Sequence, residues 1–375
     1  MKILLLSPYH AKSHQIWCEG LMANISARWT VLTLPPRYFT WRIRGNSLSW
    51  AFSEKVTLQQ HFDLIIATSM TDLNGLIGFL PELGKVPAIL YFHENQFAYP
   101  VTSFARENVE PKIVPLYAAL TADHLCFNTQ YNYQTFLSGA KKLLRSMPDN
   151  VPVGLIEKIQ EKSTILPVPI SCTSFSRSTV VSRYKSPHSH PVFSIVWNHR
   201  WEYDKWPECF FQALSRLVAK GVVFELHVLG EQFKKHPGIF EKAKNQFSCY
   251  IKSWGRVEDE RQYRSILSRA HIVVSTALHD FQGLAVLEAV AAGCVPVVPD
   301  RLAYCELFAD QYRYESDVAD INKQSQYLAD HIFILYEQFL KNALPAAPEV
   351  NGLSWANQKD KYLRLFNAVK KERGN

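Results

Sequence analysis

The sequence predicts an α/β protein with two Rossmann-like domains that face each other across a cleft. Short apolar runs alternate with helical patterns along both halves of the 375-residue chain, which is typical of parallel sheets covered by helices on both faces. Between the halves, residues 171–191 are rich in Ser, with Pro and basic residues and no regular period. This composition indicates an interdomain linker.

Each domain has its own series of predicted strands. The N-terminal domain, residues 1–170, has apolar runs at 2–7, 29–34, 62–69, 88–94 and 124–129. The second domain, residues 192–352, has them at 192–197, 222–230, 249–254, 271–276 and 294–298. Residues 353–375 follow a helical pattern, and we expect this helix to pack back toward the N-terminal domain.

Composition narrows the class of protein. Hydrophobic residues make up 47% and charged residues 20%, as in a globular protein. The apolar runs are shorter than the roughly 20 residues of a membrane span, and the N-terminus lacks a signal-peptide pattern, so we expect a cytoplasmic protein without membrane contact. The seven cysteines are scattered and contain no CxxC pair, which favours neither a zinc site nor a disulfide framework.

The net charge of +7 leaves two interpretations open. A moderately basic enzyme is ordinary, but the same charge suits a polyanionic partner, either nucleic acid or an anionic membrane. No GxGxxG fingerprint occurs, which disfavours a dinucleotide redox site.

Ligands of open parallel sheets bind outside the carboxyl ends of the strands, so the loops there are the first candidates for a site. After strand 2–7, Ser13 and His14 lie at a predicted helix N-terminus that could hold an anion, or that is simply a polar turn with Ser13 as its cap. The strand at 88–92 is followed by four hydrogen-bonding side chains, which indicate either a site or a plain surface loop: His93, Glu94, Asn95 and Gln96.

Two further loops carry charged residues. Arg200 and Lys205 precede a helix that begins near Pro207, which suits a diphosphate, although a solvated pair beside neighbouring acids is an alternative. Asp280 and Glu288 flank the start of another helix and could accept hydrogen bonds from vicinal sugar hydroxyls. The alternative is dipole compensation by Asp280 and a buried, paired Glu288. Together the loops predict a nucleotide-sugar site.

Residues 279–298, HDFQGLAVLEAVAAGCVPVV, resemble the acidic-x7-acidic motif of the retaining glycosyltransferases of family 4, which have the GT-B fold. Asp280 stands where the family usually has Glu, and Gln282 separates Phe281 from Gly283. The stretches YFHENQ and HRWEYDKWPE resemble more narrowly the tRNA-queuosine mannosyltransferase subfamily, and the similarity runs from Met1 to residue 355. One departure is AKSH at 11–14, where relatives have glycines.

The resemblance implies a substrate pair and a set of roles. The donor would be GDP-mannose, and the acceptor the cyclopentenediol hydroxyl of queuosine in a tRNA anticodon loop, with tRNA-Asp as the expected tRNA. No metal, cofactor or protein nucleophile is expected. The implied catalytic residues are His93, Arg200, Lys205 and Asp280. The implied donor-binding residues are Ser13, His14, Asn198, Gly255, Arg256, Phe281, Gly283, Leu284 and Glu288. The implied acceptor-nucleoside residues are Glu94, Asn95 and Gln96.

Residues 35–50 fit an RNA acceptor, because arginines can neutralise phosphates and aromatic rings can stack unpaired bases. The expected tRNA-binding residues are Arg37, Trp41, Arg42, Arg44, Lys141 and Lys142. The alternative is a hairpin or loop that packs its aromatic residues on the core and leaves its arginines in solvent.

Two rival functions stay open at this point. One is a family 4 transferase that uses another nucleotide sugar with a lipid or glycan acceptor. The other is a tRNA- or nucleotide-binding protein without turnover, which the shorter acid at Asp280 would favour.

Overall fold

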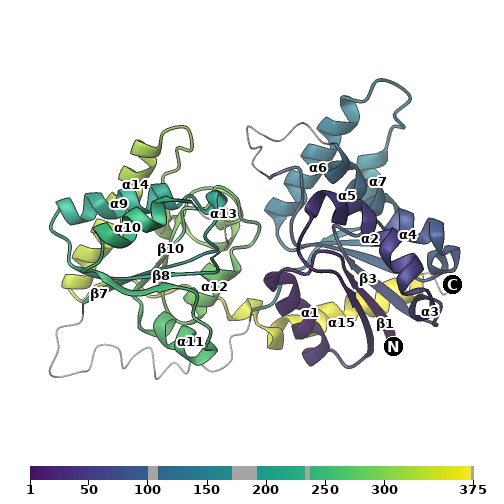
Figure 1. Cartoon of the computed structure of the whole chain (residues 1–375), viewed down its shortest axis with the longest axis horizontal. Helices are drawn as coiled ribbons and strands as arrows, with labels where there is room; N and C mark the ends of the chain where they lie inside the picture. The colour runs from purple at the N-terminus through teal and green to yellow at the C-terminus, as the bar shows by residue number, and fades with distance from the viewer. Residues whose placement is uncertain (100–108, 171–191, 233–236, 373–375) are drawn as a thin grey trace. The chain divides into compact units, whose positions relative to one another are not determined.

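The chain divides into two compact units, each with its own sheet (Figure 1). The computed structural model describes residues 1–99, 109–170, 192–232 and 237–372. Unit 1 comprises Met1–Pro169 and Trp355–Asn375, and unit 2 comprises Ile170–Ser354. The predicted linker at 171–191 lies outside the described residues.

Unit 1 contains a six-stranded parallel sheet in the order β2-β1-β3-β4-β5-β6. The strands are β1 Lys2–Ser7, β2 Arg28–Thr33, β3 Leu64–Thr68, β4 Ala88–Phe92, β5 His124–Phe127 and β6 Ser163–Ile165. Every residue of β3 and β4 is buried, because helices cover both faces of the sheet.

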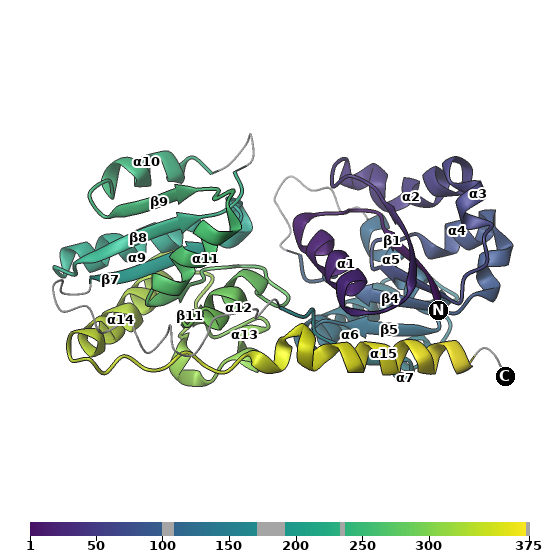
Figure 2. The ribbon, with the colours of Figure 1, turned by 90° about the horizontal axis from the view of Figure 1, so that it is seen from below.

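The helices of unit 1 form two layers. They are α1 Lys12–Asn24, α2 Phe39–Ser53, α3 Lys55–Leu58, α4 Leu73–Phe79, η1 Pro81–Lys85, α5 Glu110–Thr121, α6 Gln130–Arg145, α7 Leu155–Glu161 and α15 Trp355–Glu372. Helices α1 and α15 lie on one face of the sheet, and α2, α4 and α5 on the other (Figure 1). Figure 2 shows the C-terminal helix α15 from the side. It packs against α1 at Gly20, where the Trp355 indole fills the space that a Cβ at residue 20 would occupy.

The structure rules out the alternative that residues 35–50 form a hairpin or loop. The part of this segment from Phe39 onward belongs to helix α2.

Unit 2 repeats the architecture, with strand order β12-β11-β10-β7-β8-β9. The strands are β7 Phe193–Asn198, β8 Phe224–Leu229, β9 Ile251–Gly255, β10 Ile272–Val274, β11 Val295–Pro299 and β12 Arg313–Tyr314. The helices are η3 Tyr203–Lys205, α9 Pro207–Ala219, α10 Ile239–Gln246, α11 Glu260–Arg269, α12 Leu284–Ala291, α13 Tyr304–Leu307, η4 Asp310–Tyr312, α14 Ile321–Leu340 and η5 Asn351–Leu353.

The pairing of β7 with β10 places the candidate site of unit 2. These strands are parallel neighbours although they lie far apart along the chain, so the loops after them leave the same edge of the sheet side by side. The loop after β7 carries Lys205, and the loop after β10 carries Asp280.

The predicted α/β class with two Rossmann-like halves is confirmed by these two sheets. Among the described residues, no helix is both long enough and apolar enough to cross a bilayer.

Candidate active site

Lys205 is the centre of the charged cluster in unit 2. Its side chain is buried, and Nζ donates to the carbonyl oxygen of His279 at 2.6 Å. The same nitrogen lies 3.3 Å from Asp204 Oδ2 and 3.5 Å from Asp280 Oδ2. Burial acts to lower the pKa of Lys205, but Asp280 and Asp204 outweigh it and raise the pKa above its ordinary value. Lys205 is therefore a fixed cation and not part of a solvated surface pair.

The loops after β7 and β10 are also tied together through their backbones. The Leu278 amide donates to the Asp204 carbonyl oxygen at 2.8 Å, and Thr276 Oγ1 donates to the Lys205 carbonyl oxygen at 2.7 Å. Because these bonds join the backbone at Lys205 to the residues just before Asp280, they fix the two loops that carry the Lys205–Asp280 pair.

Asp280 is fixed by the turn that precedes α12. Its Oδ1 accepts from the Gly283 amide at 2.8 Å, and its Oδ2 faces Lys205. Burial acts to raise the pKa of Asp280, but Lys205, His199 and the Gly283 amide outweigh it and hold the pKa below its usual value. Gly283 has φ 67°, and a Cβ there would lie 2.7 Å from Tyr304 Cε1, so both conformation and space require glycine.

Glu288 lies one turn into α12 and belongs to a directed hydrogen-bond chain. Asn198 Nδ2 donates to the Tyr263 hydroxyl at 3.0 Å, and that hydroxyl donates to Glu288 Oε2 at 3.3 Å. Burial raises the pKa of Glu288. Asn198 also anchors the start of α12 through the Ala285 carbonyl oxygen at 2.8 Å. Tyr263 is thus a site residue that the sequence analysis missed.

The remaining predicted donor residues of unit 2 lie at other positions of that unit. Arg200 pairs with Glu202 at 2.9 Å, and Arg256 lies 3.7 Å from Glu231. Gly255 has φ 93°, and the Gln232 side chain fills the space that a Cβ at residue 255 would occupy. Phe281 is buried edge-on against His279, with ring centroids 4.6 Å apart, and Leu284 is the first residue of α12.

Unit 1 brings His14 and His93 together. Their rings stack with centroids 4.3 Å apart, and His14 Nε2 lies 3.2 Å from Glu94 Oε2. Burial and the neighbouring His14 hold the pKa of His93 well below its usual value, so His93 is neutral at pH 7. Among the described residues, Nε2 of His93 is buried without a hydrogen-bond partner.

In unit 1, one alternative interpretation, Ser13 as a helix cap, and one prediction, Asn95 as an acceptor contact, need correction. Ser13 is exposed inside α1, whose cap position is Ala11, so Ser13 does not cap the helix. Asn95 is buried, and its amide nitrogen donates to Asn132 Oδ1 at 2.8 Å while its Oδ1 accepts from the Phe97 amide at 3.0 Å. Both ends of the Asn95 side chain therefore fasten the loop instead of facing a substrate. Glu94 and Gln96 are half-buried beside it.

The predicted RNA-binding residues lie on α2, on the chain just before it and on α6. Trp41 is 54% exposed and lies flat over Gly45, while Arg37 stacks on the exposed Tyr38 ring at 5.5 Å. Arg44 is exposed and lies 3.5 Å from Asp72. Lys141 and Lys142 are exposed in the last turns of α6.

Arg42 departs from the expectation for these residues. Its side chain is only 9% exposed and its Nε is buried without a hydrogen-bond partner among the described residues, so Arg42 offers a phosphate less surface than Arg44 does.

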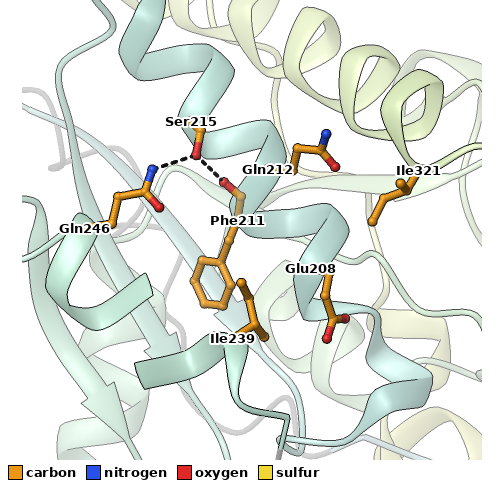
Figure 3. A pocket seen from close by; sticks show the side chains of 7 residues that line it. All are labelled: Glu208, Phe211, Gln212, Ser215, Ile239, Gln246 and Ile321. Atoms are coloured by element: carbon orange, nitrogen blue, oxygen red, sulfur yellow. Dashed lines mark hydrogen bonds between the residues drawn. The ribbon is translucent and has the colours of Figure 1, made fainter. Parts of the chain in front are cut away.

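A separate groove of about 320 Å³ lies on the outer side of α9, next to α10 and α14 (Figure 3). Its lining residues are Glu208, Phe211, Gln212, Ser215, Ile239, Gln246 and Ile321. Gln246 Nε2 donates to Ser215 Oγ at 2.9 Å, so these two polar groups satisfy each other. None of the predicted site residues lines this groove.

Metal-ligating groups do not gather elsewhere in the described part of the chain. No group of three or more His, Cys, Asp or Glu side chains there is arranged to hold a metal ion.

Comparison with known proteins assigns both halves of the chain. Residues 2–170 match the family model described as tRNA-queuosine alpha-mannosyltransferase N-terminal, and residues 191–338 match that of glycosyl transferases group 1. A protein of Drosophila melanogaster named tRNA-queuosine alpha-mannosyltransferase is 29% identical over 320 residues, which cover 84% of each chain. Residues 2–170 thus belong to the N-terminal family of tRNA-queuosine alpha-mannosyltransferases.

Solved structures agree with the fold of this family member. The Anabaena protein Alr3699/HepE in complex with UDP and glucose has a TM-score of 0.69 at 14% identity, covering 98% of this chain and 100% of that one. A sucrose-phosphate synthase from Thermosynechococcus elongatus has a TM-score of 0.64 at 11% identity, covering 100% and 97%. At these identities the likeness concerns the fold, and the fold is GT-B. The chain is a GT-B glycosyltransferase.

Proposed function

We propose that this glycosyltransferase moves mannose from GDP-mannose to the cyclopentenediol hydroxyl of queuosine in a tRNA anticodon loop, with retention of configuration. The observation that carries the acceptor half of this proposal is the family match over residues 2–170, together with the name of the fly relative. The donor half rests on the charged cluster at the carboxyl edge of the sheet in unit 2.

The cations of unit 2 would act on the leaving group. Lys205 is charged and already oriented, so it can stabilise the negative charge that grows on the departing diphosphate without reorganising. Arg200 offers a second, more exposed guanidinium whose fork matches phosphate oxygens. The first amides of α12, at Gly283 and Leu284, add the positive end of a helix.

The two acids would divide the hydroxyls of the donor. A carboxylate has about four acceptor positions, and three donors reach Asp280, so one position remains for a sugar hydroxyl. Glu288 accepts from Tyr263 on one oxygen, so we assign its remaining capacity to the ribose. His93 in unit 1, with its buried Nε2, is proposed to contact the transferred sugar.

No metal is proposed for the reaction, because Lys205, Arg200 and the helix amides supply the positive charge that a metal would otherwise provide. Glu94 and Gln96 remain proposed contacts to the acceptor nucleoside, since they follow His93 on the same loop.

The test is incubation of the purified chain with several nucleotide sugars and with queuosine-containing tRNA, followed by mass spectrometry of the released nucleosides. We expect a hexose increment on queuosine with GDP-mannose, and none on the same tRNA carrying guanosine. Transfer to a lipid or free glycan, with no increment on any queuosine tRNA, would refute the acceptor proposal. An increment only with another nucleotide sugar would refute the donor.

A further inference from the structure

The segment after β11 reaches the site of unit 2 although the sequence analysis assigned it no role. The backbone turns sharply at Leu302, which has φ 60°, a conformation that non-glycine residues rarely adopt. On either side of this turn, Arg301 and Tyr304 point back at the loop that carries Asp280.

Arg301 holds the backbone of that loop. Its Nη2 donates to the Ala277 carbonyl oxygen at 2.8 Å, and its guanidinium lies over the Trp206 ring at 5.9 Å from the centroid. Trp206 follows Lys205 directly and has φ 48°. One side chain therefore contacts both loops that form the Lys205–Asp280 pair.

Tyr304 reaches the pair itself. The Tyr304 hydroxyl lies 3.3 Å from Asp280 Oδ2 and 2.9 Å from Ser275 Oγ, and the side chain is fully buried. The Ala277 amide, which can only donate, lies 3.3 Å from Ser275 Oγ.

The two ends of this chain of hydrogen bonds fix its direction. The Ala277 amide must donate and the ionised Asp280 must accept, so Ser275 donates to Tyr304 and Tyr304 donates to Asp280. The Tyr304 hydroxyl thus donates its proton to the Asp280 oxygen that also faces Lys205.

We propose that Tyr304 is a positioning residue of the donor site, whose hydroxyl orients the Asp280 carboxylate and, through it, the Lys205 ammonium. The proposal rests on the proposed function, since it assigns Tyr304 to the same leaving-group chemistry. Tyr304 also fills the space beside Gly283, so its ring and its hydroxyl fix the same turn from two sides.

The experiment compares Tyr304→Phe with Tyr314→Phe in the full-length protein. Tyr314 is the matched control, because it is a buried tyrosine whose hydroxyl donates to the Ser275 carbonyl oxygen at 2.9 Å without touching Asp280. For Tyr304→Phe we expect kcat to fall about tenfold or more, the scale of one hydrogen bond to a charged group, with a smaller change in KM for the donor. Tyr314→Phe should keep the wild-type kcat.

The pH profile separates positioning from a merely structural role. A hydrogen bond to the ionised form of Asp280 favours that form, so its loss should move the acid limb of kcat to higher pH. Lys205, His199 and His279 also favour the ionised form, whereas Asp204 is a second acid facing Lys205, and none of these groups changes in the variant. Ser275→Ala, which keeps Tyr304 but removes its donor, should shift the limb in the same direction by less.

Three outcomes would overturn the proposal: a wild-type kcat and acid limb in Tyr304→Phe, an equal loss in Tyr314→Phe, or an unshifted limb in Ser275→Ala should Tyr304→Phe fail to fold. Failure of the proposed function gives a different result, because the wild-type protein itself would then transfer no sugar to queuosine tRNA.

Discussion

Lys205 shows how a buried side chain stays charged in a site that needs a cation. Removing an ammonium from water disfavours the charged form, and the two acids Asp204 and Asp280 reverse that effect. The His279 carbonyl oxygen at 2.6 Å gives the ammonium a further partner. The resulting cation has a fixed place, which is what electrostatic stabilisation of a leaving group requires.

Replacing Lys205 by Ala should have two effects. We expect kcat to fall by about 10²-fold or more, because one fixed electrostatic donor is lost. The free energy of unfolding should also fall by about 3–5 kcal/mol, because buried acids lose their partner. Steady-state kinetics and denaturant unfolding measure both effects. Lys220→Ala is the control, since its pair with Asp330 is partly exposed and should contribute no more than about 1 kcal/mol. Unchanged turnover at saturating donor would remove Lys205 from the mechanism.

Glu288 differs from Lys205, because burial disfavours its charged form and raises its pKa. The direction in which its replacement changes stability can therefore be predicted. Because burial raises its pKa above that of the unfolded chain, its ionised form lowers stability above the folded pKa, and this penalty vanishes below about pH 4.3, the unfolded value. Glu288→Gln should therefore raise Tm at pH 7 and lose that advantage in acid. Its affinity for GDP should nevertheless drop by about 1.5–3 kcal/mol, as a charged acceptor is lost. Calorimetry with GDP and thermal melts at several pH values test this, and unchanged GDP affinity would contradict the ribose role.

At the scale of elements, the site in unit 2 depends on how α12 begins. The left-handed turn at Gly283 sends the helix back over the sheet and aims its amide at Asp280. The Tyr304 ring then fills the space where a side chain at residue 283 would lie. The start of α12 thus sets the positions of Asp280 and Glu288 together.

Gly283→Ala should therefore lower the free energy of unfolding by more than the strain of its backbone conformation alone would. Gly221 provides the control, because it also has positive φ, at 74°, but open space around the missing Cβ. We expect Gly221→Ala to cost about 1–2 kcal/mol, or roughly 2–8 °C in Tm, with donor kinetics unchanged. Gly283→Ala should lower Tm further and also reduce kcat. Equal effects of the two substitutions would mean that the contact with Tyr304 has no part in the site.

At the scale of the molecule, periodic patterns were enough to predict the two α/β halves, because buried parallel strands appear as short apolar runs. Contacts between distant residues were not predictable in this way. Tyr263 in α11 and Tyr304 in α13 reach Glu288 and Asp280 only because the fold brings these elements together, and nothing in the neighbouring sequence marks them. Arg42 is a residue type expected in an RNA contact, but its place on α2 leaves it only 9% exposed.

The net charge of +7 and the exposed residues of α2 and α6 lead to the last prediction, on tRNA binding. Arg37 and Lys141 are exposed, so replacing both by Ala should weaken binding and flatten the salt dependence, by about 0.7 in the log–log slope for each phosphate that is no longer neutralised. Trp41→Ala should weaken binding by about 1–3 kcal/mol per stacked base without changing the slope, because stacking carries no charge.

Filter binding at several salt concentrations gives both quantities. Lys85→Ala is the control, since Lys85 is also exposed but pairs with Glu82 in η1. Donor hydrolysis without tRNA should be unaffected in all three variants, because none of these residues belongs to unit 2, where the donor cluster lies. An unchanged slope in the Arg37 and Lys141 variant would place the tRNA phosphates elsewhere. A changed slope in Trp41→Ala would mean that the indole acts by arranging neighbouring cations and not by stacking on a base.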